Sequence, residues 1–274
     1  MLDIYDYIIL FLLGSLGAFT AGFLGVGGGI IYIPILDYFL SKIGLRDDVL
    51  VKAILANSLF VIIFSGLVAS YKQYRIKNFY PKEILYTAIP GLVTAVFMTY
   101  LIDIGEWYSK EAFSYVFAIM LCIIIVRMFL SKGQPPIESS ETIRPLPLSI
   151  TGFFAGFITA LSGLGGGVIM TPVFTDALKM NIKKASSVSN GVIPFFAIAV
   201  GVYNVSSMAP NFMGDWQVGF IALPIVLPMI AATFMLAPVG VNYAQKASPK
   251  FIRMVFASFV TIVFVKLVWG LVTG

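Results

Sequence analysis

Histidine is absent from this chain of 274 residues, and cysteine occurs once, at Cys122. A single cysteine cannot form an intramolecular disulfide. No carboxylate pair lies inside the apolar segments, and without histidine the usual groups of hydrolytic and metal catalysis are missing. A nucleotide-binding loop of the form Gly-x-x-x-x-Gly-Lys-Ser/Thr is also absent. We therefore expect neither an enzyme nor a bound cofactor or metal.

Charged residues are scarce as well, at 11% of the chain, whereas 59% of the residues are apolar. This is too little charge to cover the surface of a soluble domain of this size. An uncharged stretch of about 18 residues or more is a candidate for a membrane-spanning helix. Such stretches occupy residues 7–36, 53–71, 84–102, 145–175, 185–214 and 216–245. We therefore expect an all-α, polytopic membrane protein in a lipid bilayer.

The formal net charge of +5 does not indicate a nucleic-acid partner, because the basic residues form short clusters between the apolar stretches. If the N-terminus lies outside, most of them fall in cytoplasmic loops, as the positive-inside rule requires. These residues are Lys72, Arg75, Lys77, Lys82, Arg127, Lys132, Arg144, Lys179, Lys183, Lys184, Lys246, Lys250 and Arg253. The charge distribution predicts that both termini lie on the outer side.

A motif near the start of the chain recurs in its second half. Residues 25–34 read Gly-Val-Gly-Gly-Gly-Ile-Ile-Tyr-Ile-Pro, and residues 163–172 read Gly-Leu-Gly-Gly-Gly-Val-Ile-Met-Thr-Pro. We therefore expect two related halves, residues 1–133 and 147–274, joined by a polar, proline-rich cytoplasmic linker at 134–146.

Each half is expected to contain five hydrophobic segments. They lie at 4–24, 30–43, 50–71, 83–103 and 111–131, and then at 146–162, 168–180, 185–205, 216–240 and 252–272. Because five is odd, the two halves would enter the membrane from opposite sides, as inverted repeats of secondary transporters do.

Three consecutive glycines in each half disfavour a continuous helix. Their cost relative to alanine is about 3 kcal/mol, at roughly 1 per residue, and a proline follows five residues later at Pro34 and at Pro172. We expect a break at each glycine run, followed by a segment too short to cross about 30 Å of hydrocarbon. Whether that segment spans or re-enters is open. The alternative is close packing of intact helices, since both runs contain G-x-x-x-G spacing.

A helix that begins at a glycine run exposes free backbone N–H groups and the positive end of its dipole, which together form an anion site. Asn57 and Asn190 occupy equivalent positions in the halves, inside apolar stretches. Their amides are expected either to complete the anion site or to satisfy carbonyls freed by the breaks. The candidate binding residues are Gly27, Gly28, Gly29, Asn57, Ser58, Ser162, Gly165, Gly166, Gly167 and Asn190.

The paired glycine runs, each followed by a proline, resemble those of the TauE/SafE family of sulfite exporters, and the resemblance covers residues 5–272. The matching positions are Gly25, Gly27, Gly28, Gly29 and Pro34, then Gly163, Gly165, Gly166, Gly167 and Pro172. The second half departs from the first at the alignment partner of Gly22, where it has either Ala160 or an insertion. The resemblance implies a permease of the prokaryotic cytoplasmic (inner) membrane that handles sulfite or organosulfonates.

Together, these features predict a secondary transporter that moves a small sulfur-containing anion by alternating access. An anion channel and a non-transporting assembly subunit are the alternatives. The sequence leaves open the exact substrate, the direction of movement, the coupling ion and whether copies form a homo-oligomer.

Overall fold

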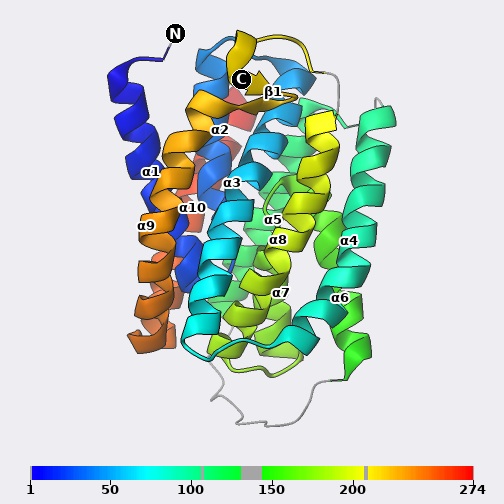
Figure 1. The fold of residues 1–274 in the computed structure, drawn as a ribbon, viewed down its shortest axis with the longest axis vertical. Helices are drawn as coiled ribbons and strands as arrows, with labels where there is room; N and C mark the ends of the chain where they lie inside the picture. Colours follow the sequence, from blue (N-terminus) through cyan, green and yellow to red (C-terminus); the bar gives the residue numbers. More distant parts are fainter. Residues whose placement is uncertain (1, 106–107, 131–143, 207–208, 274) are drawn as a thin grey trace.

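The computed structural model describes residues 2–105, 108–130, 144–206 and 209–273. These residues form a bundle of α-helices (Figure 1). The helices are α1 (Ile4–Leu24), α2 (Gly29–Lys42), α3 (Asp47–Arg75), α4 (Pro81–Ile104), α5 (Lys110–Leu130), α6 (Pro145–Ser162), α7 (Gly167–Pro172), α8 (Ile182–Ser206), α9 (Leu223–Lys246) and α10 (Pro249–Thr273). A π-helical turn, Val173–Ala177, continues α7. A short 3₁₀ turn, Gly214–Trp216, precedes the antiparallel pair β1 (Gln217–Val218) and β2 (Ile221–Ala222).

Six helices of the described chain are long and apolar enough to cross a membrane, namely α1, α3, α4, α6, α8 and α9. Large apolar side chains also face outward from these helices, for example Leu12, Phe97, Phe153 and Phe234, each more than half exposed. Such a surface is stable in lipid but not in water. The prediction of an all-α, polytopic membrane protein is confirmed.

Most helix bounds agree within a few residues with the segments expected from hydropathy, but the ninth segment does not. It was expected at 216–240, whereas α9 occupies Leu223–Lys246. Pro224 lies in the first turn of α9, where its fixed φ favours the start of a helix. The apolar residues just before it form the β1–β2 hairpin instead.

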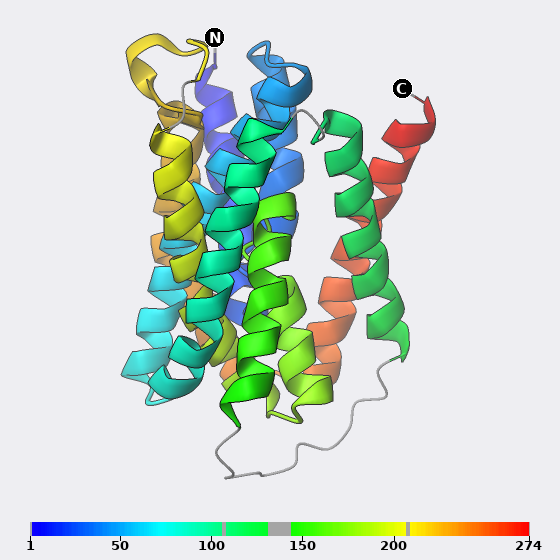
Figure 2. The ribbon, with the colours of Figure 1, turned by 90° about the vertical axis from the view of Figure 1, so that its right-hand side faces the viewer.

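The start of α1 and the end of α10 lie at the same end of the bundle, here called the termini end (Figure 2). At this end Lys42 Nζ lies 2.7 Å from Asp6 Oδ1, which joins the end of α2 to the start of α1. The opposite end, where α5 ends and α6 begins, is here called the linker end, and it contains the α3–α4, α7–α8 and α9–α10 connections. There Lys184 forms an ion pair with Glu83 at 2.7 Å. The basic residues of these three connections thus share one end, and the side of the membrane that this end faces stays a prediction.

Close contacts between glycines and backbone hold helices of the first half against helices of the second. A Cβ on Gly22 of α1 would lie 2.1 Å from the carbonyl oxygen of Ala237 on α9. A Cβ on Gly152 of α6 would lie 2.0 Å from the carbonyl oxygen of Thr87 on α4. Small residues at such positions let two membrane helices approach through their backbones.

We predict that Gly152→Ala destabilises the protein by about 1–3 kcal/mol, because the new methyl group forces α4 and α6 apart. The matched control is Gly201→Ala on α8, where the nearest atom to the new Cβ would be Ile63 Cδ1 at 3.4 Å. The control should unfold at or above the wild-type temperature, since alanine favours helix. Thermal unfolding in detergent measures both variants, and equal melting temperatures for the two would contradict this packing argument.

Candidate functional site

The two glycine runs meet in the interior of the bundle. Residues 25–28, the first glycine loop, connect α1 to α2, and residues 163–166, the second glycine loop, connect α6 to α7. A Cβ on Gly29 would lie 2.8 Å from Cα of Leu164, and a Cβ on Gly167 would lie 2.7 Å from the carbonyl oxygen of Gly25. Both loops are buried. Their backbones are therefore in direct contact.

Backbone conformation accounts for the glycines inside each loop. In the first loop φ is 72° at Gly25, 80° at Gly27 and 78° at Gly28. The second loop has the same pattern, with φ values of 67°, 73° and 73° at the equivalent glycines. Residues with a side chain are strained in this left-handed region. Glycine is thus required by conformation inside the loops and by close approach at Gly29 and Gly167.

Hydroxyl groups satisfy the carbonyls of the loops, and several cross from one half to the other. Ser58 Oγ on α3 donates to the carbonyl oxygen of Gly163 at 2.9 Å. In the opposite sense, Ser189 Oγ on α8 and Thr171 Oγ1 on α7 donate to the carbonyl oxygen of Gly25 at 2.6 and 3.0 Å. Each loop is therefore held in part by the other half of the chain.

Several backbone amides of the loops, unlike the carbonyls that these hydroxyls satisfy, lack hydrogen-bond partners among the described residues. Within the described chain, the N–H groups of Gly27, Gly28, Gly165 and Gly166 donate to no acceptor. A buried N–H group left unpaired costs about 1–3 kcal/mol. The loops thus present hydrogen-bond donors, without a basic side chain, to any acceptor that reaches them.

The two asparagines at equivalent positions have different surroundings. Nδ2 of Asn57 donates to the carbonyl oxygens of Ala53 at 2.7 Å and Phe220 at 2.8 Å. Its Oδ1 accepts from the backbone N–H of Ala222 at 2.8 Å. Asn190 is fully buried, and neither Nδ2 nor Oδ1 has a partner among the described residues. Asn57 thus binds the segment before α9, while Asn190 is left unsatisfied.

The remaining serine predicted for the site, Ser162, makes local contacts. Its Oγ donates to the carbonyl oxygen of Ile158 at 2.7 Å and accepts from the N–H of Leu164 at 3.3 Å. Sequence reasoning did not select Ser65, whose Oγ donates to the carbonyl oxygen of Gly27 at 3.1 Å, or the buried Tyr32. In the sequence, residues of this kind are marked only by being polar within an apolar stretch. That pattern does not show which loop the side chain faces.

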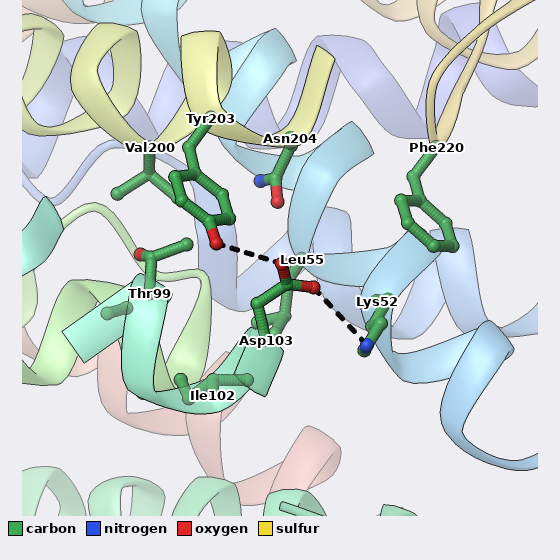
Figure 3. Close-up of a pocket in the computed structure, with 10 residues that line it drawn as sticks. Lys52, Leu55, Thr99, Ile102, Asp103, Val200, Tyr203, Asn204 and Phe220 are labelled. Carbon is green, nitrogen blue, oxygen red and sulfur yellow. Dashed lines mark hydrogen bonds and ion pairs between the residues drawn. The ribbon is translucent and has the colours of Figure 1, made fainter. Parts of the chain in front are cut away.

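A cleft opens at the termini end between α3, α4 and α8 (Figure 3). Lys52 Nζ lies 3.5 Å from Asp103 Oδ1, and the hydroxyl of Tyr203 donates to Asp103 Oδ2 at 2.8 Å. Both charged side chains are over one third exposed, so this ion pair contributes below about 1 kcal/mol. Leu55 also lines the cleft, and its Cδ2 would lie 2.9 Å from a Cβ on Gly163. The Leu55 side chain therefore lies between the cleft and the second glycine loop.

The described residues contain no cluster of three or more histidine, cysteine, aspartate or glutamate side chains that could bind a metal ion. The polar groups around the glycine loops are amides and hydroxyls. Their chemistry suits an oxyanion.

Comparison with known proteins gives matches along nearly the whole chain. The family model described as sulfite exporter TauE/SafE matches residues 10–267. A probable membrane transporter protein of Methanocaldococcus jannaschii is 28% identical over 92% of this chain and 90% of its own length. A probable membrane transporter protein of Haemophilus influenzae is 27% identical over 94% of this chain and 97% of its own length. A third protein with that description, YunE of Bacillus subtilis, is 24% identical over 76% of this chain and 81% of its own length.

We predict that Asn57→Leu lowers the stability by about 2–5 kcal/mol, because the carbonyl of Phe220 and the N–H of Ala222 lose their buried partner. The control is Thr233→Val on α9, where the buried hydroxyl bonds only the carbonyl oxygen of Ile230 in its own helix. Thermal unfolding in detergent compares the two. A loss for Asn57→Leu no larger than that of the control would contradict the structural role of this amide.

Proposed function

Since this chain belongs to the TauE/SafE sulfite exporter family, we propose that it is a secondary transporter of a small sulfur-containing anion, either sulfite or an organosulfonate. The relatives from Methanocaldococcus jannaschii and Haemophilus influenzae are described as probable membrane transporter proteins, which supports transport in general. The family description supports a sulfur oxyanion in particular. Transport of such an ion makes the lipid bilayer and the anion the partners of the chain.

One observation carries the proposal, namely that the glycine loops meet with their amides unpaired. An anion at this junction would accept hydrogen bonds from Gly27 and Gly28, and the adjoining loop would offer Gly165 and Gly166. A hydrogen bond to a charged group contributes about 1.5–3 kcal/mol, so two or three would offset much of the cost of removing the anion from water. The N-terminus of α2 adds the favourable end of a helix dipole.

The side chains around the loops favour a site built from backbone. The hydroxyls that donate to loop carbonyls come from Ser58, Ser65, Thr171 and Ser189, and none of them carries a charge. Ser162 and the two asparagines add neutral amide and hydroxyl groups. An uncharged site binds an anion without trapping it in an ion pair, and this suits a site that must also release the ion.

The directions of the helices support an inverted repeat. The first half begins at the termini end with α1, and the second half begins at the linker end with α6 (Figures 1 and 2). We propose residues 1–133 and 147–274 as the two inverted repeats, with 134–146 as the linker. Hydrogen bonds between each loop and the opposite repeat would be exchanged as the repeats rock about the anion.

The first functional prediction concerns Gly27→Ala. A Cβ there would lie 3.4–3.5 Å from Ile193, Ile62 and Leu164, without severe overlap, but it would occupy space beside the loop amides. We expect anion affinity to fall about tenfold, equivalent to one hydrogen bond to a charged group. Saturable uptake of sulfite and methanesulfonate into proteoliposomes, under imposed pH and voltage gradients, provides the measurement.

The matched control for this variant is Gly44→Ala. Gly44 also has a left-handed φ, 101°, but it lies after α2 and has no atom within 4 Å of its virtual Cβ. It introduces the same kind of backbone strain away from the loops and should leave the affinity unchanged. Equal affinities for both variants would assign the glycines to packing. Flux that does not saturate would identify a channel, and no flux from folded protein would favour an assembly subunit.

A further prediction concerns orientation in a prokaryotic inner membrane. We expect the termini end to face outward, because the basic loops of the linker end follow the positive-inside rule. In a Cys122→Ser background, Asp3→Cys should react with a membrane-impermeant maleimide added to intact cells, whereas Lys179→Cys should react only after lysis. The reverse pattern of labelling would contradict this orientation.

A further inference from the structure

Two buried hydroxyls without a hydrogen-bond partner, those of Tyr32 and Ser186, lie beside the first glycine loop. The other unpartnered buried atoms among the described residues are Gln73 Nε2 and both Nδ2 and Oδ1 of Asn190. The ring of Tyr32 would lie 2.9 Å from a Cβ on Gly28, and its buried hydroxyl has no hydrogen-bond partner among the described residues. Unpaired hydroxyls thus lie where the loop amides are also unpaired.

Helix α8 brings Asn190 to this place. A Cβ on Gly25 would lie 2.6 Å from Ser186 Oγ, one turn before Asn190 on the same helix. The hydroxyl of the preceding residue, Ser189, donates to the carbonyl oxygen of Gly25. One turn after Asn190, Ile193 Cδ1 would lie 3.4 Å from a Cβ on Gly27 and 2.7 Å from a Cβ on Gly167. The stretch of α8 that carries Asn190 therefore runs along the first loop and reaches its junction with the second.

Polar side chains around the second loop do have hydrogen-bond partners. Ser58 donates to Gly163, Thr159 Oγ1 donates to the carbonyl oxygen of Ala155 at 2.7 Å, and Ser162 has both a donor and an acceptor partner. Asn57, the counterpart of Asn190, has partners for both of its polar atoms. Within the described chain, the polar side chains named here for the second loop are thus paired, whereas Tyr32 and Ser186 at the first loop and the nearby Asn190 are not.

We propose that the transported anion binds at the first glycine loop against Asn190 and Ser186, and that this site selects an oxyanion that still carries one acid proton, such as hydrogensulfite. The inference rests on the proposed function and narrows its substrate. Nδ2 of Asn190 and the amides of Gly27 and Gly28 donate to the oxygens of the anion, while Oδ1 accepts the proton of the anion.

The side chain of Asn190 has both a donor and an acceptor, and this distinguishes hydrogensulfite from a sulfonate. A sulfonate offers three acceptor oxygens and no donor, so it leaves Oδ1 of Asn190 unpaired. A hydrogensulfite ion supplies both an acceptor and an O–H donor, so it satisfies both atoms. Leaving a buried acceptor unpaired weakens binding, and sites built for a hydrogen-bonding group reject analogues that lack it.

The protein has few groups of its own that could create a pH dependence here. Toward the linker end, the charged side chains of α3, α4 and α8 are Lys72, Arg75, Lys82, Glu83, Lys183 and Lys184, and the buried Tyr32 of α2 lies beside the first loop. Histidine, the residue whose charge ordinarily changes between pH 5 and 8, does not occur in the chain. A pH dependence of binding near neutrality would therefore come from the ligand.

The test is calorimetric titration of the detergent-solubilised full chain with sulfite and with methanesulfonate at pH 6 and pH 8. We expect sulfite affinity to fall from pH 6 to pH 8 with the hydrogensulfite fraction, and methanesulfonate to bind more weakly than sulfite at pH 6. Asn190→Leu should weaken sulfite binding about tenfold or more at pH 6. Thr233→Val, a buried polar-to-apolar change on α9, should leave sulfite affinity unchanged.

Thermal unfolding separates a binding role from a structural one. Because the side chain of Asn190 makes no hydrogen bond, Asn190→Leu should not lower the melting temperature. A decrease as large as that of Asn57→Leu would overturn the assignment. Sulfite affinity that is unchanged in Asn190→Leu, or independent of pH in the wild type, would also overturn it and would indicate that water alone satisfies this amide. Binding of neither anion by the folded wild type would contradict the proposed function itself.

Discussion

The structure depends on the contact between two peptide loops at the centre of the bundle. In lipid, each backbone polar group must find a partner inside the protein, so irregular backbone is tolerated only where it is buried in protein or lines a polar cavity. The first and second glycine loops meet this constraint in part. Hydroxyls of the opposite half satisfy carbonyls of Gly25 and Gly163, whereas the amides of Gly27, Gly28, Gly165 and Gly166 have no acceptor in the described chain. This imbalance of donors over acceptors is the physical basis for proposing an anion at the junction.

Asn57 and Asn190 have different surroundings, and the connections that follow them differ in length. Asn57 and Asn190 are 133 residues apart, whereas Pro90 and Pro228 are 138 apart, so the second half has five additional residues between these positions. That part of the second half contains the β1–β2 hairpin. In this hairpin the carbonyl oxygen of Phe220 and the backbone N–H of Ala222 form hydrogen bonds with the side-chain amide of Asn57. The corresponding connection in the first half is the short segment between α3 and α4, and Asn190 has no partner. The longer connection in the second half thus supplies the partners of Asn57, whereas Asn190 has no partner in the described chain.

Much of the architecture could be predicted from the sequence because its signals are strong. Charge-free stretches predict the helices of a membrane protein, and the family resemblance follows from the glycine runs. The ninth segment was placed too early, since the residues before Pro224 are apolar enough to continue a helix but form a hairpin. Sequence periodicity does not fix which hydroxyl faces a loop, so Ser65, Thr171 and Ser186 were not selected. The different surroundings of Asn57 and Asn190 also required coordinates, because each depends on a segment distant in the chain.

The central claim is that loop amides hold the anion, and a crystal structure with selenite, the heavier analogue of sulfite, tests it most directly. Selenium gives an anomalous signal that locates the ion independently of the protein phases. We expect a selenium peak at the loops, with oxygens of the selenite ion about 2.7–3.2 Å from the amide nitrogens of Gly27 and Gly28. A peak confined to the cleft beside Lys52, or density at the loops explained by water alone in crystals saturated with selenite, would contradict it.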